Sequence, residues 1–278
     1  LIAPDVKWPF RNLVDENGKN INMIALTMPF RNDNHRELYN KYKTMGLKIL
    51  GVTSYQSFPG KIINPYEDKY HIEKKDNYIN MVIGWCYVFR NPQKYGIINK
   101  PIIDIAESDF SRLNFYKKYN DPKKYDFICV CLGDSGGNCN IGWQAHNRNW
   151  KLTKKLIPIM CKKYNLKGLL IGRKGCGLAE KCSGNLIELG KLPYWDFMRE
   201  ICKSRFTFIP NIYDASPRTL TQSLSCNVPV LLNKNILGGW KYINKNTGEF
   251  FSDKSDFEEG LKKIIKNMKK YIHEKMNK

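Results

Sequence analysis

The sequence predicts an α/β protein built from doubly wound parallel sheets and divided into two domains. Short runs rich in β-branched residues alternate with helical stretches along the chain, the order typical of parallel α/β sheets. With 278 residues the chain is longer than one such domain usually needs. We expect an N-terminal domain over residues 1–123 and a C-terminal domain over residues 124–278, and we leave open whether the last helix packs back on the first domain.

The first half has the weaker pattern. We expect strands over residues 21–28 and 47–53, with a helix over 34–45 that begins on an asparagine cap. Residues 78–89 are apolar and fit either a helix or a strand. A further strand is expected over 102–106, and the polar, proline-containing stretch FYKKYNDPKKYD after it is typical of a linker.

The second half has the regular alternation of a doubly wound domain. Its expected strands cover residues 127–132, 169–172, 186–189, 206–209 and 228–232. Its expected helices cover residues 149–164, with a kink at Pro158, and then 195–202, 216–225 and 256–271. Ligands of such sheets bind beyond the carboxyl ends of the strands, so the loops at those ends are the places to search for a site.

Composition limits the classes of protein. The net charge of +20 favours an anionic ligand such as a nucleotide, a polyanion or a membrane surface, although many of the lysines are spread over helix faces. No apolar run approaches the roughly 20 residues that span a bilayer, and the N-terminus lacks the pattern of a signal peptide. We therefore expect no membrane span and a cytoplasmic protein.

The nine cysteines do not form a metal-binding or disulfide pattern. Cys86, Cys129 and Cys131 lie inside apolar runs, where cysteine behaves as a small core residue. Cys176 and Cys182 flank a glycine-rich loop, but no CxxC pair accompanies them. We expect reduced thiols and no zinc site.

The stretch FTFIPNIYDASPRTLTQSLSCNVPVLLNKNILGGW is the most informative part of the sequence. A strand ends near Pro210, and after a short loop Ser216 is expected to cap a helix that has Pro217 at its first position. A helix N-terminus offers unpaired N–H groups and partial positive charge, which suit a diphosphate. Arg218 adds a planar guanidinium that holds phosphate oxygens in pairs. A capped helix with a surface arginine is the alternative interpretation.

The order of LGKLP, a helix, a strand, SPR, a second helix, VPV, GG and TGEFF resembles the donor domain of GT-B glycosyltransferases, in particular their exostosin-like branch. The lysine-rich sequence is also similar to exostosin-like enzymes of chlorella viruses, among them a β-xylosyltransferase. The resemblance covers about residues 186–251. It implies two doubly wound domains that face each other across a cleft, with a nucleotide-sugar donor bound by the second.

The resemblance also implies a reaction. The donor would be UDP-xylose or another UDP-sugar, and the acceptor a glycan hydroxyl, for example on a fucose-containing oligosaccharide of a viral capsid. Transfer would be inverting and would need no metal, because the helix dipole and basic residues stabilise the leaving diphosphate. No DXD metal motif occurs in the sequence.

The resemblance also implies roles for individual residues in binding the donor. The diphosphate would contact Ser216, Pro217 and Arg218; the nucleobase would contact Lys191, Leu192 and Pro193; and Gly238 and Gly239 would let the backbone approach the donor. Related enzymes often carry a glutamate for the ribose in the first turns of the SPR helix. Thr221 and Gln222 occupy the two possible positions here, and we expect Gln222 to make that contact.

Two other glycine-rich loops follow predicted strands. In GDSGGNCN, the backbone amides of Ser135, Gly136 and Gly137 are candidates for an anion site. In GRKGCG, Arg173 and Lys174 are expected to point toward the cleft. Neither loop has the Walker spacing or the GxGxxG spacing. An ordinary turn is the alternative for each.

A general base for the acceptor hydroxyl is expected from the first domain. Three clusters qualify, each of which is also compatible with a surface or capping role: Asp33 with His35, Glu67 with Asp68, and Glu107 with Asp109. We favour the first.

Three other classes fit less well. A nucleic-acid-binding protein would match the charge, but the lysines are dispersed and no known binding motif is present. A carbohydrate-binding module would use the tryptophans but leaves the second domain unexplained. A Rossmann oxidoreductase lacks its glycine fingerprint.

Overall fold

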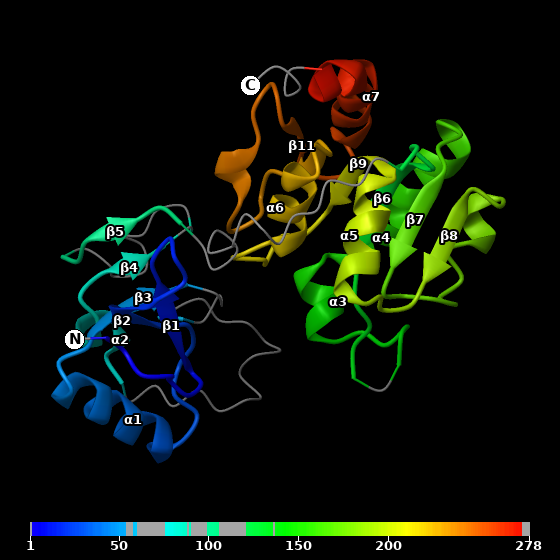
Figure 1. Ribbon diagram of the computed structural model, residues 1–278. Helices are drawn as coiled ribbons and strands as arrows, with labels where there is room; N and C mark the ends of the chain where they lie inside the picture. The colour runs from blue at the N-terminus through cyan, green and yellow to red at the C-terminus, as the bar shows by residue number, and fades with distance from the viewer. Residues whose placement is uncertain are drawn as a thin grey trace. The chain divides into compact units, whose positions relative to one another are not determined.

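The computed structural model describes residues 2–53, 58–59, 76–87, 89, 99–105, 121–135 and 137–273, with side chains up to residue 268. The chain forms two compact units, Leu1–Phe110 and Ser111–Lys278, and each contains one sheet (Figure 1). The boundary predicted at residues 123 and 124 stays a prediction. No described helix is both long enough and apolar enough to cross a membrane.

The N-terminal unit has a sheet in the order β1-β2-β3-β4-β5. The strands β2, β3, β4 and β5 run parallel, and β1 pairs with β2 in the antiparallel direction. The elements are β1 (Phe10–Val14), β2 (Asn20–Leu26), α1 (Asp33–Thr44), β3 (Lys48–Val52), α2 (Tyr78–Met81), β4 (Trp85–Cys86) and β5 (Ile102–Ile103).

Three features of this unit differ from the sequence prediction. The strand β1 was not predicted. The ambiguous segment 78–89 contains both kinds of structure, because its first residues form α2 and the buried pair Trp85 and Cys86 forms β4. Helix α1 is capped by Asn32, whose side chain accepts the backbone N–H of His35 at 3.2 Å, rather than by Asn34.

The C-terminal unit has a sheet of parallel strands in the order β11-β10-β9-β6-β7-β8. Its strands are β6 (Tyr125–Val130), β7 (Gly168–Ile171), β8 (Leu186–Leu189), β9 (Ser204–Ile209), β10 (Val230–Asn233) and β11 (Gly248–Phe251). This is the strand order of the Rossmann fold. From β6 the chain first adds strands on one side of the sheet and then, from β9, on the other side. We call the position between β6 and β9 the switch point. The predicted doubly wound sheet is confirmed.

Helices cover both faces of this sheet. Its helices and helical turns are α3 (Trp143–Asn147), α4 (Trp150–Pro158), η5 (Ile159–Lys163), η6 (Glu180–Cys182), α5 (Tyr194–Cys202), α6 (Arg218–Ser225), η7 (Trp240–Tyr242) and α7 (Phe257–His273). The α-helical hydrogen bonding of α4 ends at Pro158, where a π-helical turn takes over, since proline has no N–H to donate.

Alternate residues of each strand face opposite layers. On one face Phe127, Cys129 and Phe208 pack with α4 and α7. On the other face Ile128 packs against α5, and Leu232 packs against α6. This two-sided burial explains why the strands are apolar runs rather than alternating ones, and it fixes both layers of helices to one sheet.

The cysteine prediction is wrong for one pair. Cys139 and Cys176 form a disulfide that joins the loop after β6 to the loop after β7. The other seven cysteines form no disulfide, and six of them are buried. The buried ones include Cys86, Cys129 and Cys131, for which a core position was expected. No group of three or more potential metal ligands occurs among the described residues.

Candidate functional site

The candidate site lies where the loops after β6 and β9 leave the C-terminal sheet. These two strands are neighbours in the sheet, and their following helices, α4 and α6, lie on opposite faces. Loops that diverge in this way leave a crevice between them, which is where doubly wound sheets bind ligands.

The start of α6 differs by one position from the prediction. Pro217 is the N-cap residue, Arg218 is the first helical residue, and no side chain among the described residues caps the helix. Ser216 therefore does not cap it; its backbone N–H donates to Oδ1 of Asp214 at 3.2 Å. The first N–H groups of a helix have no partner inside the helix, so those at the start of α6 can bind a ligand.

Arg218 is exposed, and its guanidinium has no hydrogen bond or ion pair to any residue that the structure describes. Gln222 lies one turn further along α6, half-buried. The hydroxyl of Thr221 donates to the backbone oxygen of Arg218 at 3.0 Å, so it is already engaged. Of the two residues considered for the ribose, Gln222 is the one whose side chain remains available among the described contacts.

The loop after β10 lies against the start of α6. The N–H of Gly238 donates to the backbone oxygen of Asp214 at 3.0 Å. A Cβ atom on Gly239 would lie 2.6 Å from Cγ of Pro217, and Gly239 has φ of +79°, so this position requires glycine twice over. The loop of Gly238 and Gly239 thus lies against Pro217, the residue that precedes Arg218 at the start of α6.

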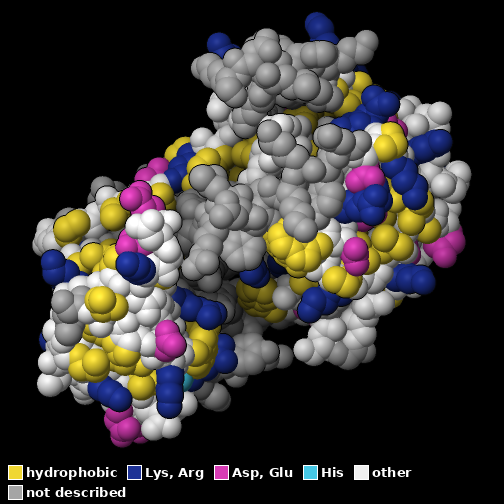
Figure 2. All heavy atoms as spheres, viewed as in Figure 1, with side chains coloured by type: hydrophobic (Ala, Val, Ile, Leu, Met, Phe, Trp, Pro, Cys, Tyr) yellow, Lys and Arg dark blue, Asp and Glu magenta, His cyan; other side chains and the backbone are white. Residues whose placement is uncertain are grey.

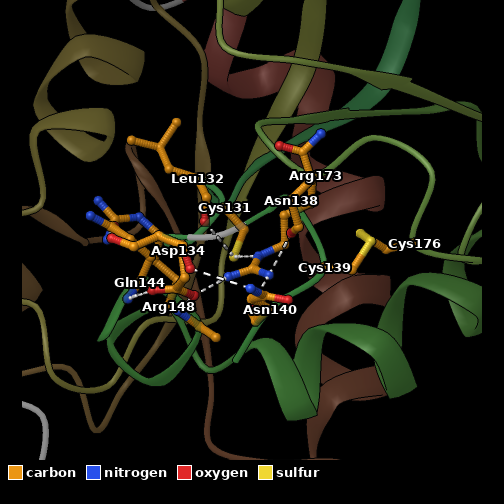
Figure 3. A network of polar contacts seen from close by, with 12 residues as sticks. Cys131, Leu132, Asp134, Asn138, Cys139, Asn140, Gln144, Arg148, Arg173 and Cys176 are labelled. Carbon is orange, nitrogen blue, oxygen red and sulfur yellow. Dashed lines mark hydrogen bonds and ion pairs between the residues drawn. A yellow bond between two sulfur atoms is a disulfide. The ribbon is translucent and has the colours of Figure 1, made fainter. Parts of the chain in front are cut away.

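The loop after β6 is built around Arg173, and this corrects the prediction for that residue. Arg173 is fully buried instead of pointing toward a cleft. Its Nη1 donates to the backbone oxygens of Asn138 and Asn140 at 2.7 and 2.9 Å, and its Nε donates to Sγ of Cys131 at 3.0 Å (Figure 3). Its Nη2 pairs with the carboxylate of Asp134 at 2.6 Å. We call these contacts the Arg173 network.

Asp134 connects the Arg173 network to α3. Its carboxylate, with only 8% of the side chain exposed, accepts the backbone N–H groups of Gln144 at 2.6 Å and Ala145 at 3.0 Å. The loop backbone is therefore already held by protein contacts. Ser135 is exposed, and Gly136 lies outside the described residues. Burial raises the pKa of the Cys131 thiol, so the sulfur that faces Arg173 is protonated at neutral pH.

Side chains from the two loops meet across the switch point. The rings of His146 on α3 and Tyr213 in the loop after β9 are stacked, with centroids 4.2 Å apart and planes 11° apart. The N–H of Ile212 donates to the backbone oxygen of Asn147 at 3.4 Å. Neither His146 nor Tyr213 was predicted, because no local pattern marks two residues that are distant in sequence and adjacent only in the fold.

The segment expected to hold the nucleobase lies at the same edge of the sheet but further from the switch point. Lys191, Leu192 and Pro193 follow β8, and β7 lies between β8 and β6. Leu192 packs against the core under α5, whereas Lys191 and Pro193 are exposed. Pro193 is the N-cap residue of α5.

In the N-terminal unit, Asp33 and His35 follow the carboxyl end of β2, as expected. Asp33 is the first residue of α1, with 90% of its side chain exposed, and it forms an ion pair with Arg36. His35 is buried, and its Nδ1 accepts the backbone N–H of Arg31 at 3.0 Å. Burial and the charge of Arg31 lower the pKa of His35, so its ring is neutral at pH 7.

These contacts leave His35 without a free basic nitrogen. Its Nδ1 lone pair is used, and in the neutral ring the other nitrogen carries the proton. The remaining candidates for the base, Glu67, Asp68, Glu107 and Asp109, lie outside the described residues.

The surface shown in Figure 2 has no basic stripe among its coloured side chains. Lysine and arginine are scattered over both units and mixed with acidic and apolar residues. On the face shown in Figure 2, this distribution differs from the continuous basic track of a nucleic-acid groove.

No protein-family model matches the chain, and no curated protein sequence matches it. Among solved structures, TarM is similar with a TM-score of 0.59 and 14% identity, over 89% of this chain and 48% of that one. A mutant of S. aureus TarM in complex with Fondaparinux, α-GlcNAc-glycerol and UDP has a TM-score of 0.55 and 12% identity, over 84% of this chain and 47% of that one.

The pneumococcal O-GlcNAc transferase GtfA, in complex with UDP and GlcNAc, has a TM-score of 0.53 and 12% identity, over 87% of this chain and 49% of that one. The chain thus spans about half the length of these structures. At such low identity the similarity is one of fold. The chain has the mixed α/β fold, with parallel sheets, of the GT-B glycosyltransferases.

Proposed function

We propose that this chain is a glycosyltransferase that binds a nucleotide-sugar donor at the switch point of its C-terminal sheet, with the diphosphate at the start of α6. The observation that carries the proposal is the exposed guanidinium of Arg218 on the first residue of an uncapped helix, beside the loop of Gly238 and Gly239. Helix N-termini and arginine together are suited to phosphate. The UDP in the TarM and GtfA complexes supports a uridine nucleotide as the first donor to test.

The finer assignment rests on the exostosin-like sequence pattern. UDP-xylose is the donor it favours among UDP-sugars, and a glycan hydroxyl, on a fucose-containing oligosaccharide in the viral case, is the acceptor. Transfer is proposed to be inverting and independent of metal, in the cytoplasm of a host cell. The N-terminal unit is proposed to bind the acceptor, with Ser216 and Gln222 contacting the donor from α6 and residues 191–193 contacting the base.

Calorimetry with UDP and uridine tests the position of the diphosphate. Arg218→Ala is expected to weaken UDP binding roughly tenfold to a hundredfold, because a charge-assisted contact contributes about 1.5–3 kcal/mol. Uridine binding should be nearly unchanged. Arg205→Ala is the matched control. Arg205 is exposed near the start of β9, whereas the candidate site follows the carboxyl end of that strand. Equal losses for UDP and uridine would place the diphosphate elsewhere.

One structural neighbour is named for a different reaction, so the chemistry needs its own test. A putative UDP-N-acetylglucosamine 2-epimerase from Listeria monocytogenes is similar with a TM-score of 0.51 and 12% identity, over 89% of this chain and 66% of that one. Incubation with UDP-sugars and glycan acceptors, followed by mass spectrometry, separates the two. A glycosyltransferase adds one sugar to the acceptor and releases UDP, whereas an epimerase returns an isomeric sugar and leaves the acceptor unchanged.

Asp33 is the proposed base within the described residues, because it is exposed at the carboxyl end of β2. Asp33→Asn should lower turnover by about 10²- to 10⁴-fold with donor affinity unchanged. If Asp33 only stabilises α1, turnover will be nearly normal and the loss will appear in thermal stability, about 0.5 kcal/mol for the exposed pair with Arg36. Normal turnover would move the search to Glu67, Asp68, Glu107 and Asp109.

A further inference from the structure

A lysine-rich surface covers one side of the C-terminal unit. The helices α4 and α7, with the turn η5, bury Leu156, Met160, Leu261 and other apolar residues in one core on the same face of the sheet. Glu258 at the start of α7 accepts a hydrogen bond from the hydroxyl of Tyr164, just after η5, at 2.7 Å. Both helices therefore lie on this face of the sheet, and they are linked where the end of η5 meets the start of α7.

The exposed charges of α4, η5 and α7 are mostly positive. We call the exposed lysines of these elements the α4–α7 lysine face; they are Lys151, Lys154, Lys155, Lys162, Lys163, Lys262, Lys263 and Lys266. The segment from Trp150 to Lys163 contains no acidic residue. The lysine face thus brings together charges from two segments that are far apart in sequence.

Few of these lysines are neutralised. On α7, Glu258 pairs with Lys163 at 2.6 Å, and Glu259 pairs with Lys263 at 2.6 Å. The other six lysines have no ion pair with any residue that the structure describes. Uncompensated like charges on one surface repel one another, so the surface is suited to a partner with distributed negative charge.

The kind of cation indicates the partner. The lysine face contains no arginine, and Tyr164, its aromatic residue, is half-buried with its hydroxyl bonded to Glu258. Proteins that bind nucleic acid add arginine and exposed aromatic rings that stack on bases. Lysine is a hydrated point charge on a flexible stem, which suits headgroups whose positions are not fixed. Clusters of 4–8 basic residues on amphipathic helices are typical of contacts with anionic lipid.

We propose that the α4–α7 lysine face binds the surface of a membrane that contains anionic phospholipid. The contact is electrostatic and peripheral, because large apolar side chains of α4 and α7, including Leu156, Ile157 and Leu261, are buried in the core and cannot insert into the bilayer. Each lysine near an anionic surface increases binding about fivefold. The interaction is independent of the donor site and of the reaction proposed for it.

Co-sedimentation of the full chain with lipid vesicles tests this proposal. Binding is expected to vesicles of phosphatidylcholine mixed with phosphatidylserine, and not to phosphatidylcholine alone, and it should fall as salt is raised. The triple variant Lys151→Gln, Lys154→Gln, Lys155→Gln should bind about a hundredfold more weakly at low salt. The matched control removes the same charge from exposed lysines of the other unit, as Lys19→Gln, Lys41→Gln, Lys48→Gln.

Melting temperatures of both variants check that they are folded, and Lys262→Gln with Lys266→Gln on α7 provides a second way to weaken the same face. The proposal is overturned if the wild-type chain binds both vesicle types equally, or if the control triple variant loses as much binding as the α4 triple variant. It is also overturned if a nucleic acid duplex binds more tightly than the vesicles and depends on the same lysines.

Discussion

Replacing Arg173 by alanine should destabilise the C-terminal unit far more than any surface arginine would. The guanidinium has no exposed surface, and its charge is balanced only by Asp134 among the described residues. Its removal leaves a buried carboxylate without its ion pair and takes the donor from the backbone oxygens of Asn138 and Asn140. Breaking a buried pair by removing one partner costs about 3–5 kcal/mol.

Urea unfolding, followed by fluorescence, measures this effect. Arg205→Ala is the comparison, because Arg205 is exposed and pairs with Asp126 at 3.3 Å. A surface pair of that kind contributes about 0–1 kcal/mol. Two units need not unfold in one transition, so each transition is fitted separately.

The pair Arg173 and Asp134 also allows a double-variant test. If the two side chains act mainly on each other, Arg173→Ala with Asp134→Ala should cost less than the sum of the single losses, since the second change removes the unpaired charge left by the first. The reasoning is refuted if Arg173→Ala costs no more than Arg205→Ala. Additive losses would show that the stabilisation comes from the backbone hydrogen bonds of Arg173 instead of the ion pair.

Further predictions concern the metal, a glycine and the disulfide. Sugar transfer should continue in excess EDTA, and a loss restored by manganese or magnesium would contradict the proposed leaving-group stabilisation. Gly239→Ala should weaken UDP binding by displacing Pro217, whereas Gly190→Ala, with no atom within 4 Å of the new Cβ, should not. Reduction of the disulfide should lower the free energy of unfolding by up to about 4 kcal/mol, as expected for a sequence separation of 37. The Cys139→Ser variant cannot form the disulfide, so its free energy of unfolding should not change with reductant.

The sequence was sufficient for most of the C-terminal sheet. Strands such as β7 and β10 are fully buried, so they are nearly continuous apolar runs. The edge strand β8 is only partly buried, but its predicted residues, 186–189, coincide with the observed ones. The interruption at Pro158 was predictable because it depends on one local property, the missing N–H. Local rules also placed the start of α6 within two residues.

The errors came from contacts between distant residues. Arg173 was assigned to the cleft because it follows a strand, but its position is decided by Asp134, which is 39 residues earlier. Cys139 and Cys176 likewise lack a spacing pattern and meet only because β6 and β7 are neighbours. The strand β1 was missed because FRNLV combines two polar residues with only partial burial and pairs at the sheet edge.

The loops after β6 and β9, which flank the switch point, are held by different kinds of contact. Substitutions in the two loops should therefore have different effects. The loop after β6 is fixed by a disulfide and by the buried charge of Arg173, which engages Asp134 and the backbone oxygens of Asn138 and Asn140. The loop after β9 is held by hydrogen bonds, by the stacking of Tyr213 on His146 and by the packing of Gly239, and it leaves Arg218 exposed. Substitutions in the first loop should therefore change mainly the free energy of unfolding, whereas those at Arg218 should change mainly the affinity for the donor. If Arg173 variants instead lose donor affinity while the free energy of unfolding is unchanged, the assignment is reversed, and the loop after β6 is the one that binds the donor.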